Sequence, residues 1–153
     1  MTEAPPVMNG MDIAGAAAAM RNLLDKTTVT VGISNSEFLA LRILAIRGPL
    51  APADLHEYLS QQLVFGLRPE KATPLLAQLD ERGLLSGTQL DGEGPAQMTE
   101  LGRKVFDDVA AAITAVSDRL YTVLDHEELV IATKVLAQIN ERATELAAEM
   151  TAD

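Results

Sequence analysis

The sequence predicts a mainly α-helical fold with a small β-hairpin, and three observations within residues 49–102 support it. A helix, a turn and a second helix occupy the first part of this segment. Leu84–Leu90 and Ala96–Thr99 then have the composition of two short strands around a turn at Asp91–Pro95. A further helix opens directly after the second strand. Helix, turn, helix, hairpin and helix in this order form a winged helix-turn-helix, in which the hairpin is the wing.

The second helix of this motif is the recognition helix, the one that would enter a DNA groove. Its start has two interpretations. Pro69 suits a first helical position, but Pro74 inside the helix would remove a backbone hydrogen bond at a cost of about 3 kcal/mol. The helix is therefore either kinked at Pro74 or begins one turn late, with Thr73 as its N-cap. Gly83 follows its last turn. One face is apolar at helical spacing, through Ala72, Leu75, Leu76 and Leu79.

Helices are also predicted before this motif. An apolar stripe predicts a first helix from Asp12, and the β-branched segment Thr27–Ile33 fits either its extension or a loop. Ser34 and Glu37 form a capping-box pattern that opens a strongly apolar helix, which should be the buried centre of the domain. The next helix opens at Pro52, and its predicted inner face consists of Leu55, Tyr58, Leu59 and Leu63.

Two long helices are predicted after residue 99. The first runs to about Val123, and Asp125 with Glu128 forms a capping-box pattern that opens the second. Three heptads in this last helix form an apolar seam, at Leu129, Ala132, Leu136, Ile139, Ala143, Leu146 and Met150. A small winged helix cannot bury so long a seam. We therefore expect the last helix to pack against the first helix and a second copy of the chain, although a three-helix packing within one chain is the alternative.

These elements predict three regions along the chain. Residues 1–10, which contain two prolines and one acidic residue, are expected to be a disordered tail. Residues 34–99 form the predicted winged helix-turn-helix domain. Residues 11–33 and 100–150 form a predicted helical dimerisation region.

The motif residues resemble the MarR family of bacterial transcription regulators. The recognition helix of that family ends in Leu-x-x-x-Gly-Leu, which is matched within LLAQLDERGLL. After the wing, the family has Leu-Thr-x-x-Gly at the start of a long helix, and Met98–Gly102 fills this position with Met for Leu. The resemblance covers roughly residues 12–150. It implies a homodimer that binds double-stranded DNA at a pseudo-palindromic site, with a small aromatic ligand that can release it.

The predicted DNA contacts lie beside the outward face of the recognition helix. They are Arg68, Lys71, Thr73, Gln78 and Arg82. The centre of that face is instead apolar or acidic, and the wing lacks the arginine with which the family enters the minor groove. The net charge of the chain is −10, which is also unfavourable for binding phosphates. The alternative function is therefore a winged-helix module that binds a protein or a ligand and has weakened or lost DNA binding.

Other function classes lack sequence support. The chain has no cysteine, which excludes disulfides, thiolate nucleophiles and zinc–thiolate sites. No Gly-rich phosphate loop, metal-ligand spacing or nucleophile elbow is present, so we expect no enzyme activity, no catalytic residue and no metal or other cofactor. The first residues lack a basic stretch, and no apolar run reaches the roughly 20 residues that cross a bilayer. A cytoplasmic protein without a membrane partner is expected.

Overall fold

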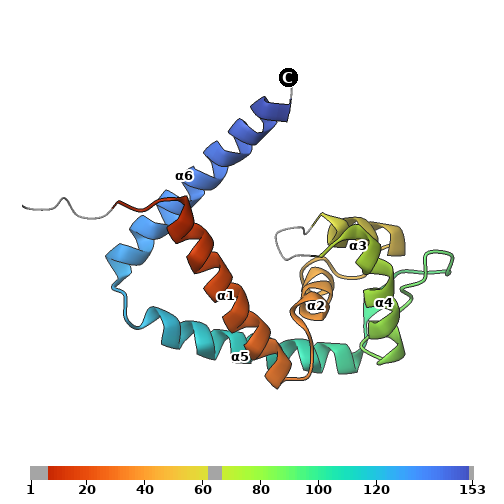
Figure 1. The fold of residues 1–153 in the computed structure, drawn as a ribbon. Coiled ribbons are helices and arrows are strands. Elements are labelled where there is room, and N and C mark those ends of the chain that lie inside the picture. Colours follow the sequence, from red (N-terminus) through yellow and green to blue (C-terminus); the bar gives the residue numbers. More distant parts are fainter. Residues whose placement is uncertain (1–6, 62–66, 152–153) are drawn as a thin grey trace, which may run out of the picture. The chain divides into compact units, whose positions relative to one another are not determined.

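The computed structural model of the chain describes residues 7–61 and 67–151 (Figure 1). It contains helices α1 (Gly10–Thr30), α2 (Asn35–Arg47), α3 (Pro52–Ser60), a short 3₁₀ helix η2 (Pro69–Lys71), α4 (Ala72–Glu81), α5 (Glu100–Tyr121) and α6 (His126–Thr151), and strands β1 (Leu85–Ser86) and β2 (Gln97–Met98). The predicted fold class, mainly helical with a small hairpin, is confirmed. The chain divides into two compact units, residues 1–114 and 115–153.

The first helix starts two residues earlier than predicted, because Asn9 caps it. The Asn9 side chain accepts a hydrogen bond from the backbone N–H of Met11 at 2.8 Å, and the Asp12 carboxylate accepts one from the N–H of Asn9 at 2.9 Å. The helix then continues to Thr30, so most of the ambiguous Thr27–Ile33 segment extends α1. Residues 1–6 of the predicted tail lie outside the described residues.

The centre of the first unit is α2, as its apolar sequence predicts. Its capping box is present: the Ser34 side chain accepts from the N–H of Glu37, and Glu37 accepts from the N–H of Ser34. The helix ends at Gly48, whose φ of +76° suits glycine. Helices α3 and α4 both pack against α2 (Figure 1). The buried core contains Leu41 of α2 together with Leu55, Leu59, Leu76, Leu79 and Val109. The predicted inner-face residue Leu63 lies outside the described residues.

The hairpin forms as predicted, but its first strand is much shorter than Leu84–Leu90. Strand β1 pairs antiparallel with β2, with Leu85 opposite Met98 and Ser86 opposite Gln97. Pairing stops at Gly87, which has a φ of +70° and lies so close to Pro95 that a Cβ atom would be 2.5 Å from the Pro95 carbonyl oxygen. An additional bridge joins Leu50 to Ala96. The wing therefore has a paired base and a longer irregular tip.

The Thr-x-x-Gly sequence after the wing fastens α5 to the end of α4. The Thr99 hydroxyl donates to the carbonyl oxygens of Gly83 (2.6 Å) and Leu84 (3.1 Å), and it accepts from the N–H of Gly102 at 3.0 Å. Gly102 is buried against the Leu84 carbonyl group. The motif that carries the family resemblance is thus the joint between α4, the wing and α5.

The second unit contains α6, a single helix of 26 residues. Its predicted capping box is confirmed: the Asp125 carboxylate accepts from the N–H of Glu128 at 2.8 Å, and Glu128 accepts from the N–H of Asp125 at 3.0 Å. None of its residues is buried within the chain. Among the described residues, no single helix has the length and hydrophobicity to cross a membrane; α1 and α2 do so only as a pair, and that pair is bent by 83°.

Candidate nucleic-acid interface

The recognition helix α4 begins at Ala72, between the two predicted starts. The 3₁₀ turn before it is closed by hydrogen bonds from the N–H of Lys71 to the Arg68 carbonyl (2.9 Å) and from the N–H of Ala72 to the Pro69 carbonyl. Pro74 is then the third residue of α4. Backbone N–H groups in a first helical turn have no intrahelical partner, so a proline there removes no helical hydrogen bond. The predicted Thr73 cap is wrong, since α4 has no side-chain cap.

The two faces of α4 lie as the helical periodicity predicts. Its apolar positions are buried in the core, and they are Ala72, Leu75, Leu76 and Leu79. The opposite face is exposed to solvent through Thr73, Pro74, Ala77, Gln78 and Glu81. Thr and Gln side chains can hydrogen-bond to base edges, and alanine can contact a thymine methyl group. The exposed face therefore offers a small set of side chains suited to reading bases.

The structure separates the five predicted DNA-contact residues into two groups. Arg68 and Lys71 are exposed just before α4, and Thr73 and Gln78 are exposed on it. Within the described residues, the side chains of Arg68 and Lys71 have no hydrogen-bond or ion-pair partner. Arg82 is different, because its guanidinium is paired with Glu37 and also donates to the Gly32 carbonyl at 2.9 Å. No sequence pattern indicated this pairing, which joins residues far apart in the chain.

Other basic side chains of the first unit are engaged by neighbouring groups. Arg47 lies over the Tyr58 ring at 4.1 Å, and Arg103 lies over the Phe106 ring at 5.9 Å. Lys104 donates to Asp108 at 2.8 Å, and this hydrogen bond, with the carboxylate charge, raises the pKa of Lys104. Compared with these three side chains, the two cations before the N-terminus of α4 are better placed to meet a phosphate.

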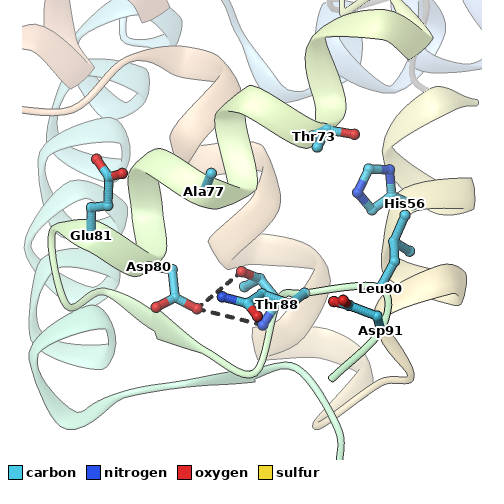
Figure 2. Close-up of a pocket in the computed structure, with 9 residues that line it drawn as sticks. His56, Thr73, Ala77, Asp80, Glu81, Thr88, Leu90 and Asp91 are labelled. Carbon is cyan, nitrogen blue, oxygen red and sulfur yellow. Dashed lines mark hydrogen bonds between the residues drawn. The ribbon is translucent and has the colours of Figure 1, made fainter. Parts of the chain in front are cut away.

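A pocket of about 340 Å³ separates the outer face of α4 from the wing. Figure 2 shows Thr73, Ala77, Asp80 and Glu81 on one side of it and Leu90 with Asp91 on the other, with His56 of α3 nearby. The Asp80 carboxylate accepts a hydrogen bond from the Thr88 hydroxyl at 3.0 Å, which ties the wing to α4. The sequence alone did not indicate this contact. The three carboxylates of the pocket make the C-terminal end of α4 acidic, in contrast to its N-terminal end. The described residues contain no group of three or more His, Asp or Glu side chains placed to hold a metal ion.

The Thr88 contact makes a first testable prediction. Thr88 is buried, so replacing it with the isosteric valine leaves the wing packed but removes the donor to Asp80. We expect the free energy of unfolding to fall by about 1 kcal/mol, the usual net worth of a hydrogen bond. Urea denaturation of Thr88→Val measures this. Thr133→Val on exposed α6 is the control. Equal losses of unfolding free energy in the two variants would show that the Thr88–Asp80 hydrogen bond stabilises the fold no more than an exposed one within a helix.

Comparison with known proteins identifies the fold. No protein-family model matches the chain, and no curated protein matches it. Solved structures do match, in 143 chains. A complex of the MarR family protein Rv2887 of Mycobacterium tuberculosis with DNA is 21% identical, with a TM-score of 0.68, and the match covers 88% of this chain and 98% of that one.

Two further structures agree. The PcaV transcriptional regulator from Streptomyces coelicolor is 18% identical with a TM-score of 0.69, over 90% of this chain and 99% of that one. The MarR family regulator SP03579 is 14% identical with a TM-score of 0.73, over 89% and 88%. At these identities the likeness concerns the three-dimensional arrangement, and it extends over nearly the whole length of each protein. The chain therefore has the winged helix-turn-helix fold of MarR family transcriptional regulators.

Proposed function

We propose that the protein is a dimeric MarR-like transcription regulator that binds double-stranded DNA through α4. The observation that carries this proposal is the exposed face of α4, where Thr73 and Gln78 stand beside Arg68 and Lys71, two cations without a partner among the described residues. In helix-turn-helix proteins the N-terminal part of the recognition helix contacts base edges. The two cations lie at that same end. The Rv2887 structure described as a complex with DNA supports the use of this fold for DNA binding.

The division of roles follows from chemistry. Arg68 and Lys71 supply the charge that binds phosphates without regard to sequence. Thr73, Gln78 and Ala77 supply the base contacts, and none of them has the bidentate donor geometry with which arginine reads guanine. Since Arg82 is occupied by Glu37, we leave it out of the proposed DNA contacts.

A dimer would place two copies of α4 about one turn of DNA apart, roughly 34 Å, to fit a pseudo-palindrome. The seam of α6 supports this part of the proposal, since several of its large apolar side chains are exposed. A small aromatic ligand that releases the DNA is also proposed. Rv2887 has been solved in complex with salicylic acid and with p-aminosalicylic acid.

A second candidate function is an interaction module that binds a protein in place of DNA. The acidic end of α4 and the wing favour it, because Asp80, Glu81 and Asp91 surround the pocket in Figure 2. A duplex lying across both ends of α4 would bring phosphates towards these carboxylates. The two candidates therefore differ in whether Arg68 and Lys71 outweigh the acidic end.

The test is a selection of bound duplexes from a random pool by the full-length protein. We expect an inverted repeat, since a two-fold dimer reads the same half-site twice. Enrichment of a single half-site would contradict the dimer and leave DNA binding intact. No enrichment at all would contradict DNA binding and favour the interaction module.

Removal of the two cations before α4 should weaken the salt dependence of duplex binding. In the double variant Arg68→Gln/Lys71→Gln, the slope of log K against log salt should become shallower by about 2 for each bound copy of α4, because each lost phosphate contact removes about one unit. Titration of the selected duplex between ~50 and 200 mM salt measures the slope. Lys134→Gln, which removes an exposed charge from α6, should leave it unchanged. A slope that does not change in the double variant would place the phosphate contacts elsewhere.

A further inference from the structure

The ion pair between Arg82 and Glu37 joins parts of the first unit that are distant in sequence. Arg82 is the C-cap residue of α4, directly after the recognition helix. Glu37 is in the first turn of α2, and Gly32 lies in the turn between α1 and α2 with a φ of +87°. One guanidinium nitrogen binds the Glu37 carboxylate, and the other donates to the Gly32 carbonyl. Arg82 therefore contacts both the turn and the helix that follows it.

Both oxygens of Glu37 are in use. One accepts the hydrogen bond from the N–H of Ser34 at 2.6 Å, and the other is paired with Arg82. The Glu37 side chain is only 5% exposed, whereas that of Arg82 is 37% exposed. A carboxylate buried to this degree is stable in its charged form only when it is paired and hydrogen-bonded. The ion pair therefore compensates for the burial of the Glu37 carboxylate, and it fixes the position of the Arg82 side chain.

The contact also requires arginine in particular. A guanidinium presents several N–H donors in a planar fork, so it can bind a carboxylate and a carbonyl group at the same time in a fixed orientation. A lysine ammonium carries the same charge but cannot reproduce this fixed geometry. The end of α4 is consequently held in one position relative to the α1–α2 turn.

We propose that Arg82 is a positioning residue, which holds the end of the recognition helix on the α1–α2 turn through Glu37 and Gly32 and thereby sets how α4 meets DNA. This inference rests on the proposed function, that α4 reads a duplex. Helix α1 ends at Thr30, two residues before Gly32. The Arg82 side chain therefore gives the end of α4 a direct contact with the turn that follows α1.

The test compares three substitutions of the pair in the full-length protein, with the selected inverted-repeat duplex as the probe. Arg82→Gln and Arg82→Lys both break the fork. Glu37→Gln weakens the pair but keeps the capping box, in which glutamine also functions at this position. Each is expected to reduce duplex affinity about tenfold, within the range of typical couplings between sites, without changing the salt slope. Ser34→Ala is the matched control: it removes the cap of α2 and leaves the pair, so it should reduce affinity much less.

The opposite results would overturn the inference. If Arg82 contacted a phosphate instead, Arg82→Gln would make the salt slope shallower by about 1 for each bound copy of α4, and Arg82→Lys would retain most of the duplex affinity. Glu37→Gln would then release the arginine and tighten binding. Weaker binding from Glu37→Gln and from Arg82→Lys, at an unchanged slope, cannot come from a lost phosphate contact.

Measurements on the free protein, without DNA, distinguish a failure of this inference from a failure of the proposed function. If the wild-type protein enriches no duplex, the proposed function fails, and hydrogen exchange of the free protein then tests the positioning role. Arg82→Lys should speed amide exchange in the last turn of α4 and around Gly32, and the effects of Arg82→Gln and Glu37→Gln on unfolding should be strongly non-additive. Additive effects with unchanged exchange would mean that Arg82 holds nothing in place.

Discussion

Replacement of Gly102 by alanine is expected to lower the free energy of unfolding by about 3 kcal/mol, the upper part of the usual range for overpacking a core. A Cβ atom at this position would overlap the backbone carbonyl group of Leu84 and lie 2.9 Å from the Cγ atom of Met98. The carbonyl cannot move freely, because its oxygen accepts hydrogen bonds from the hydroxyl and the N–H of Thr99. Relief of the overlap therefore requires α5 to separate from the start of the wing.

Urea denaturation of Gly102→Ala measures the loss, and a second glycine supplies the control. Gly15 lies within α1, and apart from the backbone of its own helix a Cβ atom there would meet no described atom within 4 Å. Alanine is a better helix former than glycine, so Gly15→Ala should stabilise the protein by about 0.5–1 kcal/mol. Two variants that add one methyl group to a helix should thus change stability in opposite directions. A similar small effect at both sites would contradict the close packing at Gly102.

Local signals were the part of the fold that sequence predicted best. The Ser34–Glu37 and Asp125–Glu128 capping boxes join residues three apart, so the pattern and the contact occur in the same few residues. The apolar face of α4 follows from periodicity in the same way. Gly102 is an intermediate case. The family resemblance marked the residue, but only the structure shows that Leu84 occupies the place of its side chain.

The structure adds what the sequence did not indicate at Arg82, at the start of α4 and in the first strand of the wing. Arg82 looked like one more base near the recognition helix, yet its partner Glu37 is 45 residues away. No periodicity or spacing reveals such a pair. The start of α4 depended on whether residues 69–71 adopt α or 3₁₀ geometry, since both fit the same prolines. The first strand of the wing, predicted over Leu84–Leu90, ends early because Gly87 turns the chain and Thr88 binds Asp80 instead of continuing the ladder.

Two glutamates in the seam of α6 are expected to convert the proposed dimer into a monomer. The large seam residues Leu136, Ile139 and Leu146 are 49%, 37% and 41% exposed in the single chain, values that are high for leucine and isoleucine at heptad positions. A shallow groove of about 400 Å³ follows this side of the helix and includes Ile139 and Leu146. In the dimer, Leu136→Glu/Ile139→Glu would bury four unpaired carboxylates, each at a cost of several kcal/mol.

Light scattering of this variant should give the 16.3 kDa mass of one chain, and the wild type about twice that mass. Lys134→Glu is the matched control: it changes the net charge by the same two units per chain, at a heptad position opposite the seam, and should remain dimeric.

The same two variants test whether DNA binding depends on the dimer. A monomer engages one half-site at a time, so affinity for the inverted repeat should fall about 100-fold or more, because the second half-site is no longer bound as an intramolecular event. Helix α6 is far in sequence from the residues proposed to touch DNA. If the double glutamate variant were monomeric and still bound the repeat as tightly as the wild type, each winged-helix domain would bind DNA independently. The spacing between two copies of α4 would then have no part in recognition.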